Sequence, residues 1–135
     1  MTVEIKGRYK GDLRVELTHS PSGSIIETDA PVDNQGKGLR FSPTDLTAAA
    51  LASCIITIMG IVARRDGINL EGLTFRAEKY MATDMPRRIS KITVELNMPK
   101  DLTDNQKKKL EKAAHTCPVH HSLHPDIEKD IKFIY

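Results

Sequence analysis

The chain has 135 residues, enough for one compact domain with its own hydrophobic core, and we expect residues 1–135 to form a single domain. Its net charge of +2 and its aromatic content of 4%, without tryptophan, argue against nucleic acid as a partner, because the chain offers neither a strongly basic surface nor stacking platforms. The N-terminal stretch MTVEIKGRYK lacks the apolar segment of a signal peptide, so we expect a cytoplasmic protein. In that reducing compartment, two cysteines are more often catalytic, redox-active or buried than joined in a structural disulfide.

The first part of the chain predicts strands followed by a long loop. Apolar and polar residues alternate over 3–17, which is typical of a hairpin, and the turn falls at the sequence KGD. The segment SIIET, residues 24–28, predicts a third strand. The loop APVDNQGKGLRF, residues 30–41, contains proline and glycines and is long enough to carry a function.

A long helix is predicted next. Ser42 suits the N-cap, Pro43 the first helical position and Asp45 the capping-box position, and Gly67 follows the expected end at Arg65. Residues 46–63 carry no charge, which reaches the lower limit of a membrane span. Because the rest of the chain is hydrophilic, we favour a central helix that a second subunit partly covers, and no membrane contact.

The remaining elements complete an α+β domain. Residues 70–81 and 88–99 predict two strands, and the second places Ile92, Val94, Leu96 and Met98 on one face. Residues 102–117 predict a helix with a Thr103–Gln106 capping box and an inward stripe of Leu110, Ala113, Ala114 and Cys117. A short helix from Pro118 and an edge strand over 127–135 close the order β-β-β-α-β-β-α-α-β.

The stretch AAHTCPVHHSLHP, residues 113–125, allows several chemistries. A structural zinc site usually needs two or more cysteines, and this stretch has one, so zinc is the weaker alternative. Cys117 stands directly before Pro118, at a helix start, where exposed amides favour the thiolate and lower its pKa. It equally suits a buried position on the apolar stripe, and both interpretations stay open.

Cys54 lies in the middle of the long helix among Ala, Leu and Ile, where burial alone would make it inert. It becomes a nucleophile only if a cation folds against it. The candidate cations are Arg8, Arg14, Arg40, Arg87 and Arg88. Strand alternation places Arg14 opposite Val15 and Leu17, on the polar face of its strand.

Two motifs together resemble one protein family. FSPTDLTAAALASC resembles the helix start and first cysteine of the OsmC/Ohr family, the osmotically inducible and organic hydroperoxide resistance proteins, and LEKAAHTCPVHHSL resembles its second-cysteine motif. The resemblance implies an OsmC-like fold, in which antiparallel strands wrap a long central buried helix in an intertwined homodimer. It also implies a thiol peroxidase that reduces organic hydroperoxides, with hydrogen peroxide as a second candidate substrate. In that cycle Cys54 attacks the peroxide and becomes a sulfenic acid, Cys117 resolves it to a disulfide, and an external dithiol reduces the pair. No metal or other cofactor is implied.

The sequence departs from the hydroperoxide resistance branch at two positions. The glutamate that pairs with the activating arginine there is Thr44 here, while the adjacent Asp45 matches an acidic residue of other branches. Arg14 is the nearest equivalent of the arginine, but the surrounding GDLR does not reproduce the motif, so the chain looks more like the uncharacterised OsmC-like branch. These departures motivate an alternative function, a small-molecule binding protein that keeps the scaffold without turnover.

Overall fold

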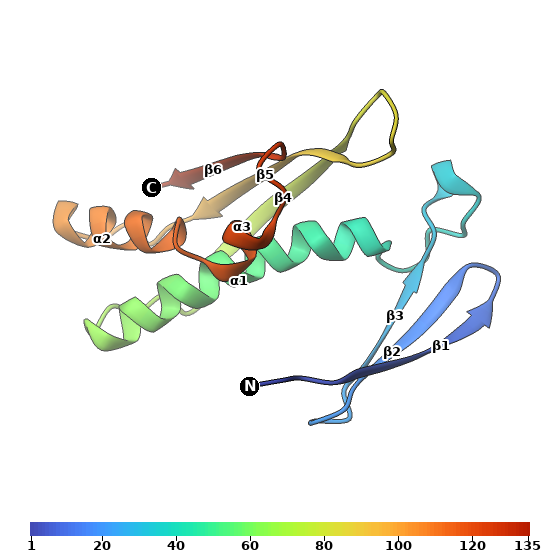
Figure 1. The fold of residues 1–135 in the computed structure, drawn as a ribbon. Coiled ribbons are helices and arrows are strands. Elements are labelled where there is room, and N and C mark those ends of the chain that lie inside the picture. Colours follow the sequence, from blue (N-terminus) through green and yellow to red (C-terminus); the bar gives the residue numbers. More distant parts are fainter. The chain divides into compact units, whose positions relative to one another are not determined.

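The computed structural model describes residues 1–135 and consists of two compact units, Met1–Leu46 and Thr47–Tyr135. The element order matches the one predicted, with one short 3-10 helix (η1) added in the long loop (Figure 1). The elements are β1 (Ile5–Gly11), β2 (Arg14–His19), β3 (Ile25–Asp29), η1 (Val32–Asn34), α1 (Pro43–Arg65), β4 (Thr74–Met81), β5 (Ile89–Asn97), α2 (Asp104–Ala114), α3 (Pro118–Ser122) and β6 (Glu128–Ile134).

The first unit is an antiparallel sheet of order β1-β2-β3 with two chemically different faces. Tyr9, Val15 and Thr28 stand opposite one another across the three strands and therefore share a face. Arg14 stands opposite Asp29 on the other face, which is charged. The predicted polar placement of Arg14 is therefore confirmed.

The second unit is built on a sheet of order β4-β5-β6. β4 and β5 pair antiparallel, whereas β6 runs parallel to β5 at the sheet edge. The parallel pairing follows from the connection between them, because α2 and α3 carry the chain back before β6 begins. The sequence pattern predicted an edge strand here, and the family resemblance implied antiparallel strands, from which the parallel direction of β6 differs.

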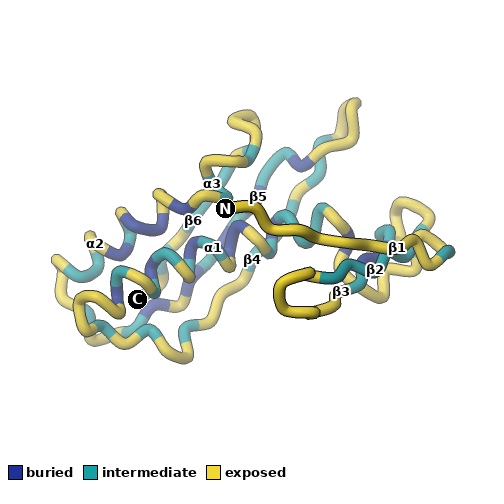
Figure 2. Tube along the Cα trace, turned by 60° about the horizontal axis from the view of Figure 1, so that its bottom comes forward, coloured by how far each residue is buried: buried dark blue, intermediate teal, exposed yellow.

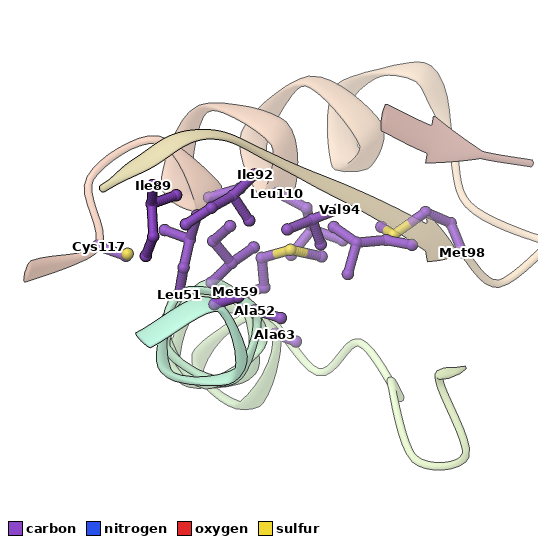
Figure 3. Packing of buried hydrophobic residues seen from close by; sticks show 14 residues of the cluster. Leu51, Ala52, Met59, Ala63, Ile89, Ile92, Val94, Met98, Leu110 and Cys117 are labelled. Atoms are coloured by element: carbon purple, nitrogen blue, oxygen red, sulfur yellow. The ribbon is translucent and has the colours of Figure 1, made fainter. Parts of the chain in front are cut away.

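The core of the second unit lies where α1, β5 and α2 meet (Figure 3). The predicted inward face of β5 and the following Met98 is buried, with Ile92, Val94 and Leu96 fully closed to solvent. The predicted stripe of α2 is buried too, and it ends at Cys117, which is 0% exposed. Both patterns are confirmed because strand and helix periods place those residues on one side.

Helix ends follow the predicted caps. Ser42 and Asp45 close the start of α1 reciprocally: the Ser42 amide donates to Asp45 Oδ2 at 2.9 Å, and the Asp45 amide donates to Ser42 Oγ at 3.0 Å. Thr103 and Gln106 do the same for α2. α1 ends at Arg65, and Gly67 adopts a φ of 70°, which a glycine reaches without strain.

α1 is apolar beyond the side that it buries. It is the one helix long and apolar enough to cross a membrane, although the core helix of a soluble protein can be equally long and apolar. Of its most apolar 18-residue stretch, 33% is buried. Ala48, Leu51, Ala52, Ile55, Met59 and Ala63 form the buried side. Burial along the whole chain is drawn in Figure 2, where β1 is exposed almost throughout.

Candidate active site

The two cysteines are both free thiols and both belong to the second unit. Cys54 is half-buried on α1 and packs against the hydrophobic core. Cys117 is part of that core and forms the N-cap of α3. Its Sγ accepts the backbone amide of His120 at 3.1 Å. α1 and the α2–α3 turn therefore supply one thiol each to the same packed region.

The pKa of Cys117 is raised, and burial is the main cause. The His120 amide bonded to the sulfur acts in the opposite direction but is outweighed, and the neighbouring Cys54 thiol raises the pKa of Cys117 further. The helix-start argument, which predicted a lowered pKa for Cys117, is therefore wrong in its net direction. Its geometric part is right, since the residue does cap the helix. Because the Cys54 thiol affects the pKa of Cys117, the two thiols lie close to each other.

Three histidines gather beside the cap of α3. The ring centroids of His115 and His120 are 6.1 Å apart, and those of His120 and His121 are 5.9 Å apart. Burial lowers the pKa of His120, and the neighbouring Lys129, His115 and His121 lower it further. No three His, Cys, Asp or Glu side chains come together in a set that could hold a metal ion.

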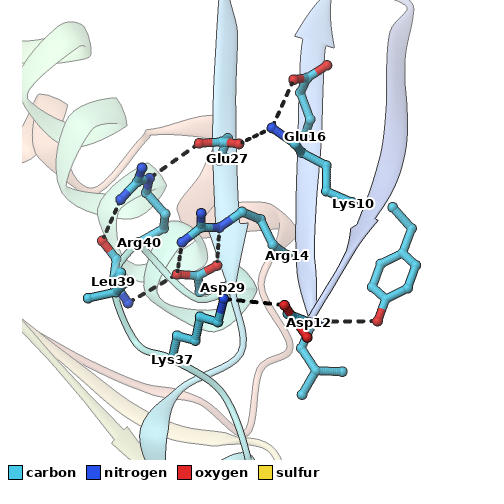
Figure 4. Close-up of polar contacts among 11 residues, drawn as sticks. Lys10, Asp12, Arg14, Glu16, Glu27, Asp29, Lys37, Leu39 and Arg40 are labelled. Carbon is cyan, nitrogen blue, oxygen red and sulfur yellow. Dashed lines mark hydrogen bonds and ion pairs between the residues drawn. The ribbon is translucent and has the colours of Figure 1, made fainter.

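Arg14 is held by a carboxylate of the neighbouring strand (Figure 4). Its Nε and Nη2 donate to Asp29 Oδ1 and Oδ2 at 2.7 and 2.9 Å, a bidentate ion pair. The Arg14 hydrogen bonds lower the pKa of Asp29, while the pair raises that of Arg14. The guanidinium and the carboxylate are thus both ionised, and the arginine has one fixed partner within its own unit.

Other candidate cations have surface partners. Arg8 pairs with Glu16 at 3.7 Å, Arg40 with Glu27 at 3.4 Å, and Arg88 with Asp84 at 3.0 Å. The three arginine side chains are between 46% and 72% exposed, so solvent screens their ion pairs.

Asp29 is the residue of this region that sequence reasoning missed. It is 1% exposed, and besides Arg14 it binds the backbone amide of Leu39 at 3.1 Å. The signal in the sequence was the segment TDAP, in which an acidic residue ends the strand IIETD just before the long loop. A hollow of about 300 Å³ opens in the same unit. Its lining includes the apolar residues Leu13, Val15 and Pro31 and the polar residues Thr28, Asp29 and Asn34.

Comparison with known proteins identifies the family. The family model of OsmC-like proteins matches residues 36–132. A candidate osmotic stress induced and detoxification response protein from Psychrobacter arcticus 273-4 is 47% identical, with a TM-score of 0.92 over 98% of this chain and 96% of that one. The chain belongs to the OsmC-like family. The resemblance drawn from the two cysteine motifs is confirmed, and so is the α+β OsmC-like fold.

More distant OsmC and Ohr structures share the fold. The organic hydroperoxide resistance protein OsmC from Legionella pneumophila is 18% identical, with a TM-score of 0.77 over 100% of this chain and 98% of that one. The organic hydroperoxide resistance protein OhrB of Bacillus subtilis is 19% identical, with a TM-score of 0.69 over 98% of both chains. No curated protein sequence matches this OsmC-like chain.

Proposed function

We propose that this OsmC-like protein is a thiol-dependent peroxidase that reduces organic hydroperoxides in the cytoplasm. The observation that carries the proposal is the pair of free, interacting thiols, one half-buried on α1 and one buried at the start of α3. Members of the same fold named for organic hydroperoxide resistance support it.

The reaction uses the two thiols in sequence. The Cys54 thiolate attacks the outer oxygen of the hydroperoxide, so an S–O bond forms, the O–O bond breaks, and the alkoxide takes a proton and leaves as an alcohol. The Cys117 thiolate then attacks the sulfur of the Cys54 sulfenic acid, so an S–S bond forms, the S–O bond breaks, and the hydroxide takes a proton and leaves as water. An external dithiol returns both residues to thiols. Burial raises the pKa of Cys117, which suits the thiol that reacts second.

We assign Arg14 as the cation that stabilises the Cys54 thiolate, as the family resemblance implies. Arg14 is 22% exposed, so its charge is less screened than the charges of Arg8, Arg40 and Arg88. Asp45 already accepts a hydrogen bond from the Ser42 amide. We therefore assign Asp45 the role of capping the start of α1, which fixes the direction of the helix that carries Cys54.

The proposed working form is a homodimer. Apolar side chains of the first unit, among them Ile5, Tyr9 and Ile26, are between 49% and 66% exposed, and α1 leaves Ile61 58% exposed. A second copy that covers these surfaces would remove the apolar area from water. Sedimentation velocity tests the assignment: the chain should sediment as a dimer, and Ile26→Glu should shift it toward monomer. A wild-type monomer at micromolar concentration contradicts it.

Counting thiols tests the chemistry. One equivalent of cumene hydroperoxide added to the reduced protein should consume both thiols rapidly. In the Cys117→Ser variant, dimedone should trap a sulfenic acid on Cys54, and Cys54→Ser should leave Cys117 unreacted. We also expect a larger kcat/KM for cumene hydroperoxide than for hydrogen peroxide, because α1 surrounds Cys54 with apolar residues.

The hollow in the first unit favours the alternative function, a small-molecule binding protein without turnover. The same experiment separates the two functions. If both thiols survive the hydroperoxide, binding becomes the better proposal, and ligand screens by thermal shift should target the apolar hollow.

A further inference from the structure

The Cys117 side chain is held in one position at the start of α3. Its Sγ accepts the His120 amide at 3.1 Å, and the side chain, which is 0% exposed, lies at one end of the core cluster (Figure 3). A thiol can accept one hydrogen bond and donate another. Because the amide already uses the sulfur as an acceptor and water does not reach it, the S–H hydrogen is left for a partner inside the core.

Cys54 supplies that partner from α1. It lies one helical turn after Leu51, which is fully buried, and it packs against the same cluster. The Cys54 side chain acts on the Cys117 thiol through a hydrogen bond and through its charge, and both raise the pKa of Cys117. A hydrogen bond that raises the pKa of an acid holds the proton on that acid. Cys117 is therefore the donor of this bond, and the Cys54 sulfur is the acceptor.

The two thiols lose their protons in a defined order. A negative charge on one sulfur disfavours a second charge beside it, so the pair ionises in two separate steps. Burial and the charge of Cys54 both keep the proton on Cys117. The first thiolate is thus Cys54, and the Cys117 thiol is its hydrogen-bond donor.

We propose that Cys117 acts in both steps of the reaction: before the hydroperoxide arrives, its thiol stabilises the Cys54 thiolate by a hydrogen bond, and oxidation of Cys54 then releases it as the resolving nucleophile. The inference deepens the proposed function and rests on it for the role of Cys54. The sulfenic acid on Cys54 carries no charge, so the repulsion that kept Cys117 protonated is gone. The proton that Cys117 releases balances the one that the departing alkoxide takes up.

The sign of the shift separates hydrogen bonding from packing. Cys117→Ser keeps a donor and an N-cap oxygen, whereas Cys117→Ala has neither. If Cys117 only packed and capped α3, its loss would let water reach Cys54, and water favours the thiolate. The titration midpoint of Cys54 would then be lower in Cys117→Ala than in Cys117→Ser. If Cys117 donates a hydrogen bond to the thiolate, the midpoint is higher in Cys117→Ala.

The experiment titrates the single thiolate of each variant by its ultraviolet absorbance, after subtraction of the cysteine-free protein. The midpoint of Cys54 should be higher in Cys117→Ala than in Cys117→Ser by about half to one pH unit, a shift of the size that one nearby polar group produces. Cys117→Val also lacks a donor and fills more of the space, so it takes the place of Cys117→Ala if that variant does not fold. As a control, Thr116→Ala in the Cys117→Ser background removes a neighbouring hydroxyl, which donates to Ala113 O at 2.7 Å, and should leave the midpoint unchanged.

Two variants of Cys54 test the release of Cys117. Cys54→Asp carries a negative charge, as the thiolate does, and Cys54→Asn is neutral, as the sulfenic acid is. The midpoint of Cys117 should be higher in Cys54→Asp by about half a pH unit or more.

The peroxide step adds a pH profile. Below both midpoints, cumene hydroperoxide should oxidise Cys54 about threefold to tenfold more slowly in Cys117→Ala than in Cys117→Ser, and above them the rates should be equal. A packing role would instead slow the reaction at every pH.

A midpoint of Cys54 that is equal or lower in the variant without a donor, or equal midpoints of Cys117 in Cys54→Asp and Cys54→Asn, would overturn the proposal. The titrations need no hydroperoxide, so the peroxidase proposal stands or fails separately. If cumene hydroperoxide leaves both wild-type thiols intact while the midpoints differ as expected, the peroxidase function is wrong and the hydrogen bond from Cys117 to Cys54 holds. If hydroperoxide consumes the thiols and the midpoints coincide, the reverse is true.

Discussion

Replacing Cys117 by alanine removes a buried sulfur and the hydrogen-bond acceptor that starts α3. The side chain is 0% exposed and belongs to the core cluster, and its Sγ accepts the His120 amide at 3.1 Å. Loss of an N-cap acceptor costs about 1 kcal/mol, and the small void left by the sulfur costs about another 1 kcal/mol. We expect reduced Cys117→Ala to lose about 2 kcal/mol of unfolding free energy, which is about 7 °C in Tm for a chain of this length.

Urea unfolding under reducing conditions, at one protein concentration, measures the change. Cys54→Ala is the matched control, because Cys54 is half-buried and lies inside α1, where it caps no helix. It should lose less than about 1 kcal/mol. Hydrogen exchange adds a local readout, in which the His120 amide exchanges faster in Cys117→Ala alone. A loss below about 0.5 kcal/mol, the scatter of neutral surface substitutions, or an unchanged His120 amide would refute the structural role of Cys117.

Three further predictions concern charged and titrating groups. Asp45→Ala should lose about 1 kcal/mol in urea unfolding because the Ser42 amide loses its acceptor, and Asp45→Asn should lose less; a slower peroxide reaction at unchanged stability would instead indicate a chemical role. The folded-state pKa of Asp29 lies below its unfolded value, so the stability from its pair is present at neutral pH and is lost as pH falls through the folded-state pKa. Urea midpoints from pH 7 to 3 should therefore fall more steeply in the wild type than in Arg14→Met, and equal slopes would contradict this. The pKa of His120 is lowered in the folded protein, so below about pH 6.5 the unfolded chain binds more protons than the folded one. The unfolding free energy should therefore decline as pH falls, until His120 also protonates in the folded protein. An NMR titration midpoint for His120 at or above that value would show the direction to be wrong.

The parts of the fold that depend on local periodicity could be predicted from the sequence. The buried face of β5 and the stripe on α2 were correct because a single face of each element meets the core. The caps at Ser42 and Thr103 were correct because their partners lie three residues away in the chain. These features need no knowledge of tertiary contacts.

The features that depend on distant neighbours could not be derived in the same way. The Arg14–Asp29 pair requires the register of β2 against β3, and two apolar runs alone do not specify that register. The pKa of Cys117 depends on burial among side chains from α1 and β5, which outweighs the favourable helix start. The interaction of Cys54 with Cys117 joins residues far apart in sequence, and only the resemblance of two motifs to one family suggested it.

Because Cys117 is closed to solvent and caps α3, the rate at which it is labelled measures local opening of the protein. A thiol reagent in solution reaches this sulfur only when the start of α3 opens, since the side chain is fully closed to solvent. With Cys54 replaced by serine, the labelling rate equals the intrinsic thiol reactivity multiplied by the fraction of molecules that are open. The labelling rate of Cys117 therefore reports how often the start of α3, in the connection between β5 and β6, opens.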